Sequence, residues 1–354
     1  VLLTAAGILT ARPLLEVMNT PADIIEDSYA YIIVIYYGVA ATAFYNLLSC
    51  IIRALGDSKT PLIFLVFASF LNVALDLLFI ITFHMGVGGA AWATVLSQGV
   101  SGLLCLGYAW RRFPLLRMEK RHWTFDWSYA WKHLRLALPM AMQFVITGTS
   151  VLVNQAVLNL FGSAAVAAFS AASKIHMLSE QVAVSFGTAM ATYAGQNYGA
   201  GKAGRVQEGL RKCALACEAI TLGIMVIMTA FGGVMSSWFI DGYHPEVIQQ
   251  AHLYLFISAL FYPALTMLFL YRNTLLGLGN GVTPMLAGVC ELLSRMIGAP
   301  VLGHFFGFTG LCWINPIAWV TASGLLFLSY RKTMRNIRPV DPTVDASDSN
   351  KIMN

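Results

Sequence analysis

Nine apolar runs of 21 residues or more recur along this chain, separated by short polar or charged segments. At a helical rise of about 1.5 Å per residue, a run of that length covers about 30 Å, the thickness of a bilayer's hydrocarbon core. Backbone polar groups in lipid must be satisfied within each segment, so we expect every run to form a helix. A tenth, shorter run covers 1–11. The nine full runs are 28–52, 60–83, 89–110, 135–161, 164–194, 213–240, 247–271, 282–305 and 310–330.

The composition supports an all-α, polytopic membrane protein. Of the 354 residues, 58% are hydrophobic and only 11% are charged, whereas soluble domains have about 25% charged residues. The net charge of +5 lies in loops, so we expect no nucleic-acid partner. No P-loop, HExxH or GxSxG motif is present, and we expect neither an enzyme nor a cofactor, only a coupling ion.

The basic residues indicate how the runs are oriented. Taken alternately, one set of connecting segments holds 18 Lys and Arg, whereas the other set holds only Arg12. Basic loops stay on the cytoplasmic side. We therefore predict a multi-pass protein of the plasma (inner) membrane whose C-terminus is cytoplasmic.

A weak internal repeat divides the chain. The letters LGD at 55–57 and TP at 60–61 recur as LGN at 278–280 and TP at 283–284. Because six runs separate equivalent points, we predict two six-helix lobes related by a pseudo-two-fold axis along the membrane normal. The chain then lacks the first two helices and most of the third. The predicted parts are a partial N-terminal lobe at 1–110, a cytoplasmic linker at 111–133, a C-terminal lobe at 134–330 and a cytoplasmic tail at 331–354.

One carboxylate, Asp76, lies in the middle of an apolar run. Such a group costs about 2.5–3.5 kcal/mol on insertion scales. Asn72 lies one helical turn away on the same face, and Thr94 is expected at a similar depth on the next helix. These oxygens suit Na⁺, and the carboxylate alone can carry H⁺. We predict a cation site of Asp76, Asn72 and Thr94, with Na⁺ as the only metal. The alternative is that neighbouring polar groups cap Asp76, which then only fixes helix packing.

Further polar residues lie in the runs of the second half. Glu180, with His176 one turn before it and Lys174 nearby, is a possible substrate or proton group, or else part of a self-neutralising cluster. Glu291 and Arg295 are four residues apart, and we interpret them as a structural salt bridge. Four amides on one run either face a central cavity, where Gln143 and Asn154 would contact substrate, or cement helix packing; they are Gln143, Asn154, Gln155 and Asn159.

Several segments resemble the multidrug and toxic compound extrusion (MATE) family. They are RALGDSKTP at 53–61, FLNVALDLLFI at 70–80, GVGGAAWATVLSQ at 86–98, LALPM at 136–140 and GQNYGAGKAGRV at 195–206. The resemblance implies a two-lobed antiporter that exports organic, often cationic, compounds against Na⁺ or H⁺. It also implies a cation site at the positions of Asn72, Asp76 and Thr94. The family's further carboxylate on the first helix has no counterpart in this sequence.

We therefore predict a secondary active antiporter that exports small amphipathic or cationic organic compounds by alternating access. Its expected partners are an organic substrate and the lipid bilayer, and we expect a monomer. Three alternatives remain open. They are a flippase for a lipid or lipid-linked sugar, an intramembrane enzyme built on His176 and Glu180, and a non-transporting scaffold.

Overall fold

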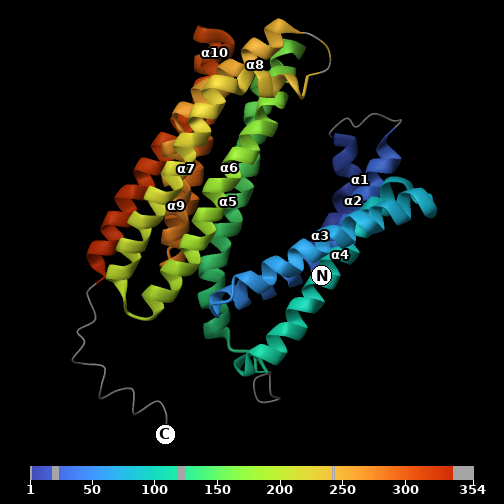
Figure 1. Cartoon of the computed structure of the whole chain (residues 1–354), viewed down its shortest axis with the longest axis vertical. Helices are drawn as coiled ribbons and strands as arrows, with labels where there is room; N and C mark the ends of the chain where they lie inside the picture. Colours follow the sequence, from blue (N-terminus) through green and yellow to red (C-terminus); the bar gives the residue numbers. More distant parts are fainter. Residues whose placement is uncertain (1, 18–23, 118–123, 241, 243, 338–354) are drawn as a thin grey trace. The chain divides into compact units, whose positions relative to one another are not determined.

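The computed structural model describes residues 2–17, 24–117, 124–240, 242 and 244–337, and within these ranges the chain is helical with no strand (Figure 1). This confirms the predicted all-α class. Six helices in the described part are long and apolar enough to cross a membrane, or seven if the bent pair α8 and α9 is one span. Nine runs are expected, and two differences explain the smaller number of helices. The runs 282–305 and 310–330 form one long helix, α10 (Val282–Asn336). The run 164–194 forms α6 (Gly162–Gly199), which carries Lys174, His176 and Glu180 and is not among the six.

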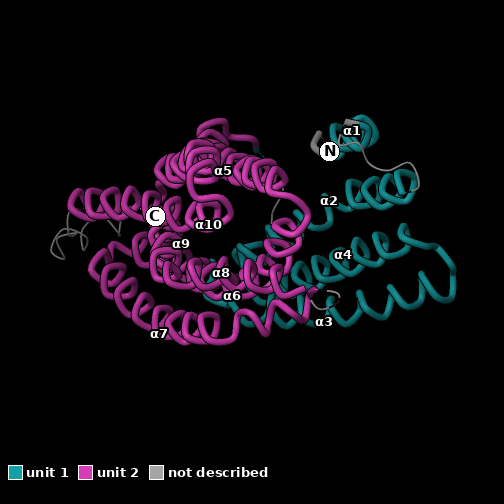
Figure 2. Tube along the Cα trace, turned by 90° about the horizontal axis from the view of Figure 1, so that it is seen from above, with its two compact units in different colours: residues 1–124 teal, residues 125–354 magenta. Residues whose placement is uncertain are grey.

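The chain divides into two compact units, 1–124 and 125–354, which Figure 2 colours separately. In the first unit, α4 packs against both α2 and α3, whereas α2 and α3 barely touch each other. Tyr45, Ile52 and Cys105 are buried where α2 meets α4. The elements are α1 (Leu2–Val17), α2 (Ile25–Ala54), α3 (Lys59–Leu77), the π-helical turn η1 (Leu78–Thr82), α4 (Gly86–Arg112) and the 3₁₀ turn η2 (Pro114–Leu116).

In the second unit, α6 packs against α7 and α9, and α10 packs against α5 and α9. The largest cluster of buried apolar side chains lies among α6, α7, α8, α9 and α10 and includes Tyr254, Leu255 and Leu268. This packing encloses the cavity described below. The elements are α5 (Trp127–Asn159), α6 (Gly162–Gly199), α7 (Ala203–Ser237), α8 (Pro245–Leu260), α9 (Tyr262–Gly277) and α10 (Val282–Asn336).

Two breaks shape the helices of the second unit. The chain bends by 53° between α8 and α9, where Pro263 follows at the start of α9 and removes a backbone donor. The second break lies inside α10 at Gly307, whose φ of 60° and ψ of −142° are not helical. Such angles are accessible almost only to glycine. Pro300 and Pro316, by contrast, lie within the helical stretches on either side.

Helix boundaries differ from expectation at several places, and the largest difference is at α7, which begins at Ala203, ten residues before the run predicted from 213. α9 continues to Gly277, so Arg272 lies inside a helix, and its side chain is more than nine-tenths buried. Without Arg272, the basic loops and the helix ends beside them hold 17 Lys and Arg, one fewer than 18. α5 begins at Trp127, inside the predicted linker, because the side chain of Asp126 accepts the backbone N–H of Ser128 at 2.7 Å and caps the helix. α10 extends to Asn336, into the predicted tail. Residues 118–123 of that linker and 338–354 of the tail lie outside the described residues.

Candidate functional site

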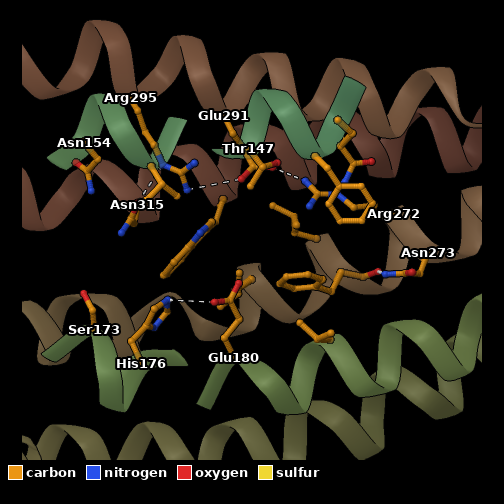
Figure 3. Close-up of a pocket in the computed structure, with 18 of the residues that line it drawn as sticks. Thr147, Asn154, Ser173, His176, Glu180, Arg272, Asn273, Glu291, Arg295 and Asn315 are labelled. Carbon is orange, nitrogen blue, oxygen red and sulfur yellow. Dashed lines mark hydrogen bonds and ion pairs between the residues drawn. The ribbon is translucent and has the colours of Figure 1, made fainter. Parts of the chain in front are cut away.

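A cavity of about 540 Å³ lies inside the second unit and is lined by α5, α6, α8, α9 and α10 (Figure 3). Its volume falls in the range of small-molecule sites. Apolar and aromatic side chains make up much of its lining, including Phe144, Phe169, Phe269 and Trp319. Between them, charged groups lie on two facing walls, as Figure 3 shows.

One wall of the cavity carries two arginines that share one carboxylate. Glu291 of α10 pairs with Arg272 of α9 through Oε1 and with Arg295, one turn further along α10, through Oε2 at 3.7 Å. All three side chains are more than nine-tenths buried. The predicted Glu291–Arg295 pair is therefore present, but it belongs to a triad with two positive charges and one negative charge.

Arg295 is held by a buried hydrogen-bond network. It donates to Ser150 Oγ of α5 at 2.7 Å and to Asn315 Oδ1 at 3.1 Å. Asn315 in turn donates to the hydroxyl of Tyr254 at 3.0 Å. Asn315 follows the break at Gly307, and this break folds the second stretch of α10 so that Asn315 reaches Arg295 on the first.

Arg272 makes fewer hydrogen bonds than Arg295. Its guanidinium bonds to Glu291 and lies over the ring of Phe269, with 5.8 Å from Cζ to the ring centroid. Its Nε is buried and has no hydrogen-bond partner in the described part of the chain. Such a donor costs free energy unless something accepts from it.

The facing wall is formed by His176 and Glu180 of α6. His176 Nε2 lies 3.9 Å from Glu180 Oε2, and His176 Nδ1 lies 2.9 Å from the hydroxyl of Tyr262. The imidazole stacks on Trp319 at 5.4 Å between ring centroids. Glu180 retains 34% of its side-chain exposure, whereas His176 retains 12%. Lys174 does not line this cavity, and its ammonium lies over the ring of Phe239.

The amides predicted on the first helix of this unit divide between two roles. Gln143, Asn154 and Gln155 line the cavity. Asn159 does not, and its Oδ1 instead accepts from Gln155 Nε2 at 2.9 Å. The structure thus brings Gln143 and Asn154 to the same cavity as His176 and Glu180.

The predicted cation-site residues lie in the first unit. Asn72 of α3 donates through Nδ2 to Thr94 Oγ1 of α4 at 3.5 Å, so these two side chains meet. Asp76 is one turn further along α3, and its Oδ1 is buried without a hydrogen-bond partner among the described residues. The described chain holds no group of three or more His, Cys, Asp or Glu arranged for a metal ion.

Sequence reasoning did not find Arg272, Ser150, Asn315 or Tyr254 as site residues. Arg272 directly follows the apolar run 247–271, and the sequence therefore predicts it as the first residue of a loop. The sequence does contain a signal for the true helix end, namely Gly279, because glycine is the residue most often found just after a helix. In the structure Gly279 has the left-handed φ of +81° that this position requires. A helix ending near Gly277 places Arg272 more than one turn inside it. The network of Ser150, Asn315 and Tyr254 joins three helices, and no local pattern predicts it.

Comparisons with known proteins agree with this fold. Residues 1–78 and 139–301 match the MatE family model. The probable multidrug resistance protein YpnP of Bacillus subtilis is 33% identical over 92% of this chain and 70% of its own length. The probable multidrug resistance protein NorM of Thermotoga maritima is 28% identical over 91% of this chain and 72% of its own length.

Solved structures have the same fold. A crystal structure of a MATE in the bent conformation superposes with a TM-score of 0.86 at 21% identity, covering 95% of this chain and 75% of that one. An outward-facing multidrug resistance MATE transporter gives 0.87 at 21% identity, with the same coverage. The apolar helices, the match to the MatE family model and the multidrug resistance relatives define a multi-pass helical membrane transporter rather than an enzyme. The chain belongs to the MATE family, as its match to the MatE family model shows.

Proposed function

We propose that this transporter is a secondary active antiporter that exports small amphipathic or cationic organic compounds, such as drugs and toxins, by alternating access. The exchanged ion is Na⁺ or H⁺. Relatives named as multidrug resistance proteins support the substrate class. The protein lies in the plasma membrane with a cytoplasmic C-terminus, in line with its basic loops.

The coupling proposal rests on the buried carboxylate oxygen of Asp76 that has no hydrogen-bond partner among the described residues. This oxygen is Oδ1 of a carboxylate on an apolar helix. An oxygen in that condition gains most from a bound cation or a proton. Asn72 and Thr94 add an amide oxygen and a hydroxyl nearby, and both are suitable ligands for Na⁺.

Neutralisation of Asp76 gives a route from ion binding to conformation. The π-helical turn η1 begins at Leu78, two residues after Asp76, so the helix changes its hydrogen-bond pattern next to the carboxylate. Such turns are frequent at functional sites. A cation or proton at Asp76 favours one arrangement of this segment, and the substrate favours the other. Exchange follows because each ligand shifts the same equilibrium in the opposite direction.

The test is efflux of a fluorescent organic cation from vesicles that contain the protein, under an imposed Na⁺ gradient and then under an imposed pH gradient. We expect one gradient to drive efflux, and we expect Asp76→Asn to fold but to lose about tenfold or more of that rate because a neutral amide cannot exchange an ion. Glu208→Gln, at an exposed carboxylate on α7, is the control and should retain the wild-type rate. Wild-type efflux in Asp76→Asn would contradict the role of Asp76.

A flippase for lipid or lipid-linked sugar is the second candidate, and the observation that favours it is the pair Arg272 and Arg295 on one cavity wall. Such guanidiniums bind phosphate well. Glu291 and Glu180 oppose that reading because they bring two carboxylates to the same cavity. Absence of efflux under both gradients, with scrambling of a labelled phospholipid, would favour the flippase.

A further inference from the structure

We infer that Arg272 binds an anionic group of the substrate, and that the cavity of the second unit is built for amphipathic zwitterions rather than for simple cations. This inference deepens the proposed export function and rests on it. It concerns the ligand of the cavity, not the coupling ion.

The first step is the charge balance of the arginine wall. Arg272 and Arg295 share the single carboxylate of Glu291, so the three buried side chains retain one excess positive charge. Arg295 has neutral hydrogen-bond partners at Nη1 and Nε, namely Ser150 and Asn315. Arg272 has no such partner among the described residues, and the excess charge is therefore best neutralised at Arg272.

The second step is the geometry of Arg272. A guanidinium carries five donors in a planar fork that matches carboxylate or phosphate. Glu291 occupies one end of this fork through the terminal nitrogen Nη2, whereas Nε is buried without an acceptor in the described structure. Arg272 also lines the cavity. Nε itself is shielded in this structure, so a second oxyanion in the cavity would supply the acceptor that Nε lacks with a turn of the Arg272 side chain toward it.

The third step is the facing wall. Glu180 is the most exposed carboxylate of the cavity, and its closest basic side chain is His176, whose Nε2 lies 3.9 Å from Oε2, beyond hydrogen-bond distance. Figure 3 shows Glu180 across the open space from the wall of Arg272 and Glu291. A ligand cation placed there faces a carboxylate and the aromatic rings of Trp319 and Phe269.

The two walls together specify the chemical class. A simple organic cation would pair with Glu180 and leave Nε of Arg272 without an acceptor. A simple anion would pair with Arg272 and leave Glu180 without a close cation. A compound with an apolar aromatic body, an oxyanion at one end and a cationic group at the other satisfies both walls. Amphipathic zwitterions carry this combination.

The experiment is equilibrium binding in nanodiscs, with no gradient, of two dyes that differ in one group. One is a rhodamine with a free carboxylate, and the other is its ethyl ester, which retains the same cationic ring system. Fluorescence polarisation gives both dissociation constants. We expect the wild type to bind the acid about tenfold more tightly than the ester, because only the acid supplies an oxyanion to Arg272. Equal binding, or tighter binding of the ester, would overturn the inference.

Variants test which side chain is responsible for the preference for the acid over the ester. Arg272→Gln should lose the preference for the acid. Its dissociation constant for the acid should rise about tenfold, while that for the ester should stay within about twofold of the wild-type value. Glu291 still has Arg295 as a counter-ion in this variant. Glu180→Gln should weaken both dyes equally, since both are cationic. Arg211→Gln, at an exposed arginine on α7, is the matched control and should change neither constant.

A second variant covers the case in which Arg272→Gln does not fold. Arg272→Lys retains the charge beside Glu291 but removes the Nε donor, and it should lose most of the preference for the acid. An unchanged preference in Arg272→Lys, or equal weakening of both dyes in Arg272→Gln, would contradict the role of Arg272. The binding assay needs no ion gradient. If the protein binds the acid more tightly than the ester but shows no gradient-driven efflux, the antiporter proposal is rejected and the zwitterion-binding site is supported.

Discussion

At the loop between α2 and α3, one carboxylate organises the start of a helix. Asp57 accepts the backbone N–H groups of Lys59 and Thr60 at 3.1 and 3.0 Å through Oδ1, and its Oδ2 accepts the hydroxyls of Thr60 and Tyr108 at 2.7 and 2.6 Å. The hydroxyl of Tyr108 and the bonds from Thr60 hold the pKa of Asp57 at about 2. Asn280, its counterpart in the internal repeat, accepts the N–H of Thr283 in the same way.

We expect Asp57→Asn to lower the melting temperature at pH 7, because an amide oxygen accepts the Tyr108 hydroxyl less strongly than a carboxylate does. A carboxylate whose pKa is depressed in the folded state stabilises it above its unfolded pKa of about 3.9, and this stabilisation is lost as the pH falls toward 2. The difference in melting temperature between wild type and variant should therefore narrow between pH 5 and pH 3, as followed by circular dichroism in detergent micelles.

The control for that series is Glu16→Gln, which removes an exposed carboxylate and should follow the wild type within about 0.5 kcal/mol. A difference between wild type and Asp57→Asn that stays constant down to pH 3 would contradict the depressed pKa of Asp57.

At the level of helices, close contact between α6 and α9 sets the distance between the two walls of the cavity. A Cβ atom on Gly277 would lie 2.4 Å from the carbonyl oxygen of Ala191, and one on Gly187 would lie 2.6 Å from Asn273 Nδ2. Small residues of this kind let membrane helices approach closely. Because α6 carries His176 and Glu180 while α9 carries Arg272, this contact places the opposite charges across one cavity.

We expect Gly277→Ala to destabilise the protein by about 1–3 kcal/mol, because the added methyl group meets backbone atoms that cannot move aside cheaply. The same change should weaken binding of the carboxylate dye by displacing Arg272. Gly223→Ala on α7 is the matched control, since a Cβ there meets nothing within 4 Å, and we expect no loss of stability, only a gain of up to about 1 kcal/mol from the higher helix propensity of alanine. Thermal unfolding of both variants measures the difference, and equal stabilities would refute the close contact.

For the molecule as a whole, orientation in the membrane follows from charge. After the reassignment of Arg272, the basic residues still lie almost entirely in one set of connections and in the helix ends beside them, which include the segment around Lys202 between α6 and α7. The segment between α7 and α8, around Gly242, has no Lys or Arg. These two connections should therefore lie on opposite sides of the membrane.

Reporter fusions in a bacterial host test this orientation. Green fluorescent protein fused after Gly201 should fluoresce and alkaline phosphatase fused there should be inactive, because the first connection is predicted to be cytoplasmic. Fusions after Gly242 should give the reverse result. The reverse pattern at both sites would contradict the predicted orientation, and the same pattern at both sites would contradict the crossing of α7.

Local patterns along the chain predict that these segments are apolar helices, since hydropathy is a property of short segments, but they predict nine spans where six or seven described helices are long and apolar enough to cross a membrane. They also placed Asn72 and Asp76 on one face, because residues four apart on a helix are neighbours. The arginine wall could not be predicted in this way. Arg272 meets Glu291 on another helix, and Asn315 reaches Arg295 only because Gly307 breaks α10. Such contacts join residues distant in sequence, and their energies depend on burial that only packing of the helices creates.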